Sequence, residues 1–283
     1  MGSTVTSGDV TAGRVRREPL VAARQAASKV PQITVFFWII KILTTAQGEA
    51  ASDWLVYRID PVLAVGIAGL ALVAALALQF RARKYVAWIY WLTVDLVAIF
   101  GTMAADGMHI KLGIPYAVSS AFFAALLFVV LVSWYATEKT LSIHSIRTRR
   151  REAFYWATVL STFALGTALG DMTATTLHLG YLTSGIMFTL IFAVPAVAHR
   201  WLRLNAIAAF WFAYIVTRPL GASYADWMGV SRSVGGLGFG RGNVAIALTI
   251  PIIAFVAYLA ISRRDVEEQA AAPRPAQPGR HRS

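Results

Sequence analysis

The sequence predicts an all-α polytopic membrane protein with eight transmembrane helices. Of its 283 residues, 57% are hydrophobic and only 14% are charged, whereas a soluble domain carries about 25% charged residues. Four long segments also have no charge in their interiors, at 62–78, 114–136, 179–198 and 243–262. Because a bilayer core of about 30 Å needs roughly 20 apolar residues per helix, we expect each of these segments to cross a membrane.

Four less apolar segments lie before and between these spans, at 31–55, 85–106, 152–175 and 205–227. Each is long enough to cross the membrane although it carries polar residues. With these segments the chain makes eight crossings. We therefore expect both termini on one side of the membrane.

The positions of Lys and Arg predict the orientation. They are frequent before the first helix, in the second, fourth and sixth links and after the last helix. The odd-numbered links hold few, with Arg232 and Arg241 of the seventh link as the exception. The positive-inside rule then places both termini in the cytoplasm and the protein in the cytoplasmic (inner) membrane. We expect basic and disordered tails at 1–29 and 263–283 around a membrane domain at 30–262.

Composition excludes several function classes. The formal charge of +12 lies in tails and links, which makes a nucleic-acid partner improbable. The absence of Cys excludes disulfides and thiolate chemistry. We find no Ser-His-Asp arrangement, zinc-protease motif or phosphate loop, and so expect no enzyme. The glycine-rich stretch at 235–242 follows no strand, and we interpret it as a tight outer loop or a re-entrant turn. Homo-oligomerisation stays open.

One pattern occurs four times: a Trp, a Gly ten residues later and an Asp five residues after the Gly. The copies are Trp38, Gly48, Asp53; Trp91, Gly101, Asp106; Trp156, Gly166, Asp171; and Trp211, Gly221, Asp226. An apolar helix follows each copy, so the repeat is a helix pair, at about 30–80, 84–136, 152–200 and 204–262. A unit with two crossings keeps its direction, so the repeats are parallel.

Further motifs accompany these repeats: PQITVFFW at 31–38, TTAQGEAASD at 44–53, TRPLGASYADW at 217–227 and GGLGFG at 235–240. With them the chain resembles a family of bacterial multi-pass proteins, often labelled membrane-anchored proteins, built from four tandem two-helix transmembrane repeats of unknown function. The resemblance covers roughly residues 30–262. It implies an architecture and supplies no activity, so function must come from the residues.

Polar residues of the odd-numbered helices follow the helical period. One face of the first helix carries Lys41, Thr45, Glu49 and Asp53, and nearly one face of the third carries Asp95, Thr102 and Asp106. A charged stripe facing lipid would be very costly. We therefore predict the polar odd-numbered helices inside and the apolar even-numbered helices outside.

The inner helices carry six acids and two bases. The acids are the candidate cation-binding residues, Glu49, Asp53, Asp95, Asp106, Asp171 and Asp226, and the bases are their candidate charge partners, Lys41 and Arg218. The excess of acid can be neutralised by protonation or by a bound cation. This pattern indicates a proton-coupled transporter or exporter of a small cation, including a divalent metal. The alternative is a non-transporting scaffold, sensor or assembly factor whose polar stripes join the repeats.

Each candidate residue type also has a plainer interpretation. The Trp residues either anchor the protein at the interface or pack the repeats together. The Gly residues permit close helix contact or form hinges. Each Asp joins an outward-facing chamber, reaches solvent alone or accepts hydrogen bonds from a neighbouring repeat. Lys41 either snorkels to water or pairs with Glu49 or Asp95, and Arg218 pairs with Asp226 or another acid. His109 and His178 either bind a transition metal or are ordinary loop residues.

Overall fold

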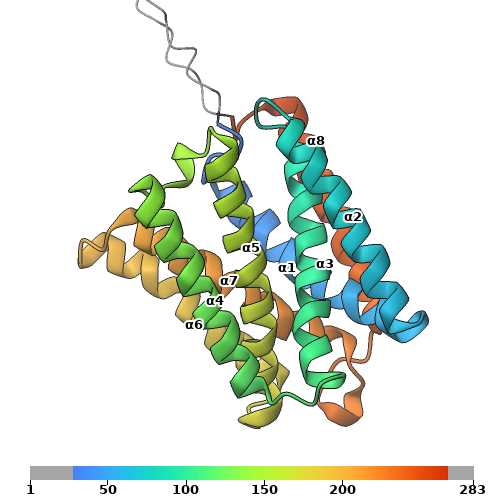
Figure 1. Ribbon diagram of the computed structural model, residues 1–283. Helices are drawn as coiled ribbons and strands as arrows, with labels where there is room; N and C mark the ends of the chain where they lie inside the picture. Colours follow the sequence, from blue (N-terminus) through green and yellow to red (C-terminus); the bar gives the residue numbers. More distant parts are fainter. Residues whose placement is uncertain (1–27, 267–283) are drawn as a thin grey trace, which may run out of the picture.

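The computed structural model describes residues 28–266, which form eight α-helices and no strand (Figure 1). Their bounds are α1 (Val35–Arg58), α2 (Pro61–Arg81), α3 (Ala87–Ile110), α4 (Tyr116–Glu138), α5 (Arg149–Asp171), α6 (Tyr181–Trp201), α7 (Ala206–Gly229) and α8 (Arg241–Ser262). The shortest have 21 residues, which is about 31 Å of helix and matches a bilayer core. A single π-helical turn, Met172–Thr176, extends α5.

Six of the described helices are long and apolar enough to cross a membrane, namely α2, α3, α4, α5, α6 and α8. The two others, α1 and α7, carry the buried charges Lys41, Glu49 and Arg218. They have 24 residues each and pack against other helices on several sides, so their polar faces do not have to meet lipid. The predicted class, a polytopic all-α membrane protein, is confirmed.

The four odd-numbered helices form a closed ring in which α1 packs on α3, α3 on α5, α5 on α7 and α7 on α1. The repeated Gly lies at each of these contacts. A Cβ would meet Ala98 at Gly48, Phe163 at Gly101, Arg218 at Gly166 and Thr45 at Gly221. The predicted close contact is therefore present at all four interfaces. The equivalent Gly of each repeat lies at each interface, so the repeats are related by a rotation about the ring axis.

The even-numbered helices cover the outside of this ring. Helix α2 packs mainly on α3, α4 on α5, α6 on α7 and α8 on α1. Each outer helix therefore covers the inner helix of the following repeat, and the last outer helix closes on the first inner helix. The outer helices bury few residues, whereas half or more of α1 and α7 is buried. The polar-inside, apolar-outside arrangement is confirmed.

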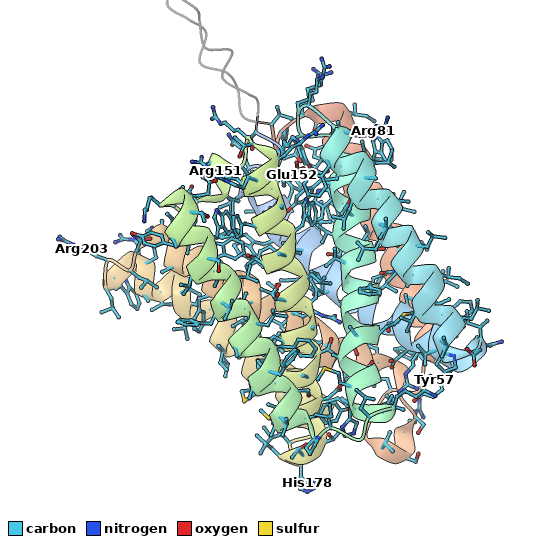
Figure 2. The ribbon with its side chains drawn as sticks, viewed as in Figure 1. Tyr57, Arg81, Arg151, Glu152, His178 and Arg203 are labelled. Atoms are coloured by element: carbon cyan, nitrogen blue, oxygen red, sulfur yellow. The ribbon has the colours of Figure 1, made fainter. Side chains whose placement is uncertain are left out.

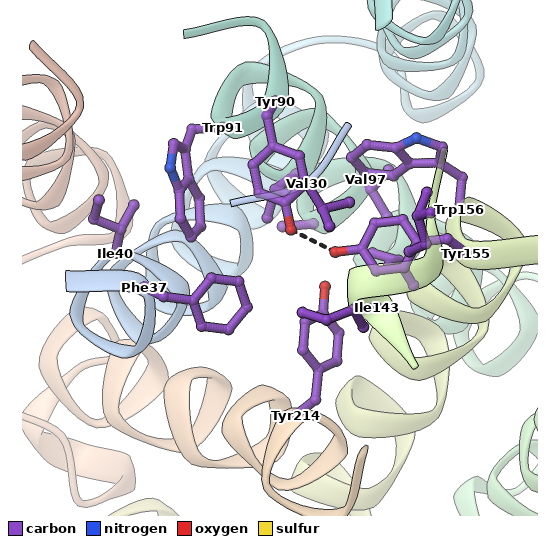
Figure 3. Packing of buried hydrophobic residues seen from close by; sticks show 14 of the residues in the cluster. Val30, Phe37, Ile40, Tyr90, Trp91, Val97, Ile143, Tyr155, Trp156 and Tyr214 are labelled. Carbon is purple, nitrogen blue, oxygen red and sulfur yellow. Dashed lines mark hydrogen bonds between the residues drawn. The ribbon is translucent and has the colours of Figure 1, made fainter. Parts of the chain in front are cut away.

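The repeated Trp residues lie inside the helix bundle. Trp91, Trp156 and Trp211 are at most 5% exposed and belong to one aromatic cluster with Tyr90 and Tyr155 (Figure 3). Trp38 is half-buried and packs against this cluster. The interpretation of these Trp residues as interfacial anchors is therefore wrong, because the inner helices bring their indole rings together.

The two ends of the described chain meet at the same end of the bundle, which we call the terminal end. The backbone N–H of Gln32 donates to the carbonyl of Asp265 at 2.9 Å. Lys29 is 6% exposed and its Nζ lies 2.5 Å from a carboxylate oxygen of Glu152. Lys29 and Asp265 thus belong to the packed domain and not to the tails. The remainder of the predicted tails, 1–27 and 267–283, falls outside the described residues.

Alternate links lie at opposite ends of the bundle. Figure 2 labels Arg81, Arg151 and Glu152 at the terminal end and Tyr57 and His178 at the opposite end. We call this opposite end the acidic end, because every inner helix carries its repeated Asp there, within its last two turns.

Candidate cation site

Five carboxyl groups come together at the acidic end. Oxygens of Glu49, Asp53 and Asp106 lie within 4.8 Å of one another. Asp171 and Asp226 interact electrostatically with the same residues. Each repeated Asp comes from a different inner helix. We call these five residues the acidic group, and the structure thus places five of the six candidate acids in one cluster.

A buried ion pair forms the inner boundary of the acidic group. Arg218 is fully buried, and its Nη2 lies 2.7 Å from a carboxylate oxygen of Glu49. The guanidinium also donates to the hydroxyl of Thr167 at 2.7 Å, to that of Thr102, and to the carbonyl of Thr45 at 2.5 Å. This network joins all four inner helices. Arg218 thus pairs with an acid other than Asp226, as one of the two sequence interpretations allowed.

Thr45 and Thr102 lie on the polar faces predicted from the sequence, whereas Thr167 was missed. Counted from the repeated Trp, Thr102 and Thr167 occupy the position that Glu49 occupies in the first repeat. Each hydroxyl lies 3.3 to 3.4 Å from the Glu49 carboxylate. Aligning the four copies on their Trp would have identified this layer, because equivalent positions of a ring meet at its axis.

Arg241 is a second missed residue, although its link stood out as the exception to the charge pattern. It begins α8, and its Nε lies 2.5 Å from a carboxylate oxygen of Asp53. Its guanidinium also lies over the ring of Tyr57, 4.8 Å from the centroid. Arg241 therefore compensates an acid of the same protein, which explains a positive charge at this end.

The glycine-rich stretch folds back on the end of α7. Leu237 donates its N–H to the carbonyl of Trp227 at 2.7 Å, and Phe239 donates to Met228 at 3.1 Å. Gly235, Gly238 and Gly240 have positive φ angles, which glycine adopts without steric cost. The stretch is the tight loop of the two sequence interpretations, and it satisfies carbonyls that the helix end leaves free.

Lys41 fits neither sequence interpretation. It is 1% exposed, so it does not snorkel to water, and its Nζ has no hydrogen-bond partner among the described residues. Instead Nζ lies 3.9 Å from the ring centroid of Phe163 and 4.2 Å from that of Tyr214. The predicted pairing with Glu49 or Asp95 is wrong, because α5 and α7 place aromatic rings around the amine.

Three other candidates lie outside the acidic group. Asp95 is half-buried and lies about three turns from Asp106 along α3. His109 stacks on Tyr116 and bonds through Nδ1 to the carbonyl of Ile114. His178 is exposed at the tip of a link (Figure 2). Neither histidine joins the one potential metal cluster found among residues 28–266, so the structure does not assemble the proposed imidazole ligands.

A cavity of about 690 Å³ gives access to part of the acidic group. It lies between the acidic ends of α1, α2 and α3, and both Asp53 and Asp106 line it. The remaining wall is mainly apolar and includes Val65 and Met103. A ligand in this cavity would therefore contact two carboxylates.

The architecture defines the class of this protein: a multi-pass membrane protein made of four parallel two-helix repeats closed into a ring. The chain belongs to the family described as Repeat of Unknown Function (DUF347), whose model matches residues 36–85, 89–140, 154–205 and 209–265. This match confirms the resemblance drawn from the motifs. No curated protein and no solved structure matches the chain.

Proposed function

We propose that this protein transports a small hard divalent cation across the cytoplasmic membrane and that the acidic group is its binding site. The observation that carries the proposal is the charge balance on the ring axis. Five carboxyl groups meet two guanidinium groups, those of Arg218 and Arg241, so three carboxyl groups have no paired base. Uncompensated carboxylates at this depth bind protons or cations.

The chemistry of the side chains favours a hard cation. The acidic group offers carboxylate oxygens together with threonine hydroxyls, and the chain contains no Cys. Oxygen ligands of this kind suit Mg²⁺, Ca²⁺ and Mn²⁺, whereas Zn²⁺ and Cu²⁺ prefer imidazole and sulfur. We therefore expect the acidic group to accept Mn²⁺ and Mg²⁺.

Proton coupling follows from the same charge balance. A divalent cation and protons compete for the same carboxylates, so binding of one releases the other. The opposite half of the ring axis is packed with aromatic side chains, which supports a state that is closed toward the terminal end. Such one-sided closure is what alternating access between parallel repeats requires.

The orientation and the absence of an enzymatic activity belong to this proposal. The terminal end carries the basic links, including Arg81 and Arg151, and we assign it to the cytoplasm. The acidic end then faces outward. The acidic group has no adjacent nucleophile and base pair of the kind that covalent catalysis needs, which supports transport over catalysis.

The proposal is tested first by cation binding to the purified protein in detergent. Divalent cations that bind the native state raise the melting temperature of the wild type by mass action. At a cation concentration a hundred times Kd, the free energy of unfolding increases by about 2.7 kcal/mol. The rise is larger at mildly alkaline than at mildly acidic pH. It is lost in Asp106→Asn and retained in Asp95→Asn, which removes a carboxyl group from the same helix outside the acidic group.

Transport is then measured in proteoliposomes with an internal Mn²⁺-sensitive dye. We expect Mn²⁺ flux in the wild type and in Asp95→Asn, and none in Asp106→Asn. A wild-type protein that neither binds nor moves any cation would overturn the proposal.

The second candidate function is a non-transporting scaffold. It is favoured by the Arg218 network, which joins all four inner helices and so resembles a structural clamp. The same experiment separates the two functions. For a scaffold, Asp106→Asn changes the melting temperature equally with and without cations.

A further inference from the structure

The buried polar groups without a hydrogen-bond partner among the described residues include the amine of Lys41 and the hydroxyl of Tyr214, both on the ring axis. Both side chains are at most 1% exposed. A buried polar group without a partner costs free energy and calls for an explanation. Structural packing alone does not supply one, because Met and Phe would fill the same space without this cost.

The surroundings of Lys41 permit both a charged and a neutral amine. The ring faces of Phe163 and Tyr214 stabilise the ammonium ion. Burial opposes the charge, and Arg218 is the one charged group among the described residues that acts on it. The lysine stem is flexible. Lys41 is therefore suited to accept and release a proton.

The unpartnered hydroxyl of Tyr214 points toward two other buried tyrosines (Figure 3). Tyr90 of α3 and Tyr155 of α5 are joined through their hydroxyls by a hydrogen bond. Three of the four inner helices thus contribute a hydroxyl to one cluster, and Phe37 of α1 packs beside it. A small rotation of Tyr214 would complete a chain of three hydroxyls.

This chain extends in both directions along the axis. Toward the terminal end, the ring of Tyr85 contacts that of Tyr90 at 5.7 Å between centroids, and its hydroxyl donates to Asp265 at 2.5 Å. Toward the acidic end, the next charged side chain after Lys41 is Arg218, which keeps its protons and holds Glu49. Proton-exchanging side chains therefore extend from Tyr85 to Lys41, and water would carry the proton from Lys41 past Arg218 to the acidic group.

We infer that Lys41 and the hydroxyls of Tyr214, Tyr155 and Tyr90 form a proton path between the terminal end and the acidic group. In each step an oxygen accepts one proton and passes its own to the next oxygen, and neutral Lys41 takes up a proton on its nitrogen lone pair and releases it again. Water at either end supplies and removes the protons. The closely packed aromatic rings exclude a hydrated metal ion, so the path is selective for protons.

The inference rests on the proposed function, because it supplies the proton route of the coupled transport. Its test uses the full chain in proteoliposomes with an internal pH-sensitive dye. An outward K⁺ gradient with valinomycin drives proton entry without any divalent cation, and an Mn²⁺ gradient drives the coupled exchange. Tyr155→Phe, Tyr214→Phe and Lys41→Met each remove one polar group and preserve most of the side-chain volume.

We expect each variant to lower proton flux at least about tenfold while the cation-induced rise in melting temperature is kept. Tyr224→Phe is the matched control, because it removes a hydroxyl from α7 that bonds to Thr189 away from the axis. It retains the wild-type proton flux. The retained melting response shows that the variants are folded.

Two results would overturn the inference. One is wild-type proton flux in Tyr155→Phe and Lys41→Met. The other is wild-type Mn²⁺ transport without any proton movement, which leaves cation transport by the acidic group intact but removes its coupling to protons. Conversely, valinomycin-driven proton flux that depends on Tyr155 in a protein that binds no cation would overturn the proposed function and support the path.

Discussion

Arg218 of α7 and Glu49 of α1 form a buried ion pair across the contact that closes the ring, with 2.7 Å between Nη2 and the carboxylate oxygen. The two residues are 169 positions apart in the chain. Because α1 is the first inner helix and α7 the last, this pair joins the two ends of the repeat array. Loss of one of the two residues would leave the charge of the other buried and unpaired.

Removing one partner of this pair should destabilise the protein more than removing both. Arg218→Met leaves the Glu49 carboxylate uncompensated, and we expect a loss of about 3–5 kcal/mol in the free energy of unfolding. The double variant with Glu49→Gln should recover part of that loss. Thermal unfolding in detergent measures the stability of the single and double variants. If the loss in the double variant equals the sum of the two single losses, the two residues are not coupled.

Gly166 tests the close contact between inner helices. A Cβ at this position would overlap the first side-chain carbons of Arg218 and the ring of Pro219, neither of which can move away freely. We expect Gly166→Ala to cost about 1–3 kcal/mol of stability, as overpacking does. Gly66→Ala on α2 is the control, because no atom lies within 4 Å of its Cβ. Equal melting temperatures for the two variants would show that the contact is not tight.

The ring of inner helices could be predicted in part from the sequence, because it depends on residue spacings within each single helix. The spacing of Trp, Gly and Asp is constant, so one face of each inner helix is equivalent, and the excess of charge on those faces excludes lipid contact. Helix number, parallel repeats, inner and outer helices and the convergence of the repeated Asp all follow from this. The position of the indole rings was predicted wrongly, because an aromatic residue near a helix end suits either the membrane interface or a buried layer.

Pairings across the ring could not be predicted, because they depend on which helices are neighbours. Lys41 has acids at helical spacing on its own helix, yet α5 and α7 place the rings of Phe163 and Tyr214 against it. Asp95 lies on nearly the same face of α3 as Asp106, but about three turns further from the acidic end, so it does not reach the acidic group. The outer helices carry few polar residues, so little in the sequence specifies which inner helix each one covers.

The contact between Tyr85 and Asp265 at the terminal end predicts a pH dependence of stability. Burial raises the pKa of the Asp265 carboxyl above its usual 3.8, and the hydrogen bond from Tyr85 opposes this rise. The folded state therefore holds the proton more tightly than the unfolded state, so this group's contribution to stability falls as the pH rises from 3.8 through the raised value.

Two variants should change this dependence in opposite directions. Asp265→Asn removes the titrating group, so its melting temperature falls less than that of the wild type as the pH rises. Tyr85→Phe removes the hydrogen bond that opposes the pKa shift, so its melting temperature falls more. The difference from the wild type at each pH isolates Asp265 from the other carboxyl groups, and parallel curves for all three proteins would contradict the prediction.

Arg241 should limit cation affinity at the acidic group, because its Nε lies 2.5 Å from Asp53 and occupies one of the carboxylates that a cation would use. We expect Arg241→Gln to strengthen Mn²⁺ binding roughly tenfold at low ionic strength, after allowance for solvent screening at this half-buried position. The Mn²⁺ concentration that gives half of the rise in melting temperature measures the effect.

Arg58→Gln removes a positive charge from the end of α1 at the same end of the bundle, and its half-point should stay near that of the wild type. If both variants shift the half-point equally, the net charge of this end governs binding and the Asp53 pair does not. If Arg241→Gln weakens binding, Arg241 instead holds Asp53 in the position that the cation needs.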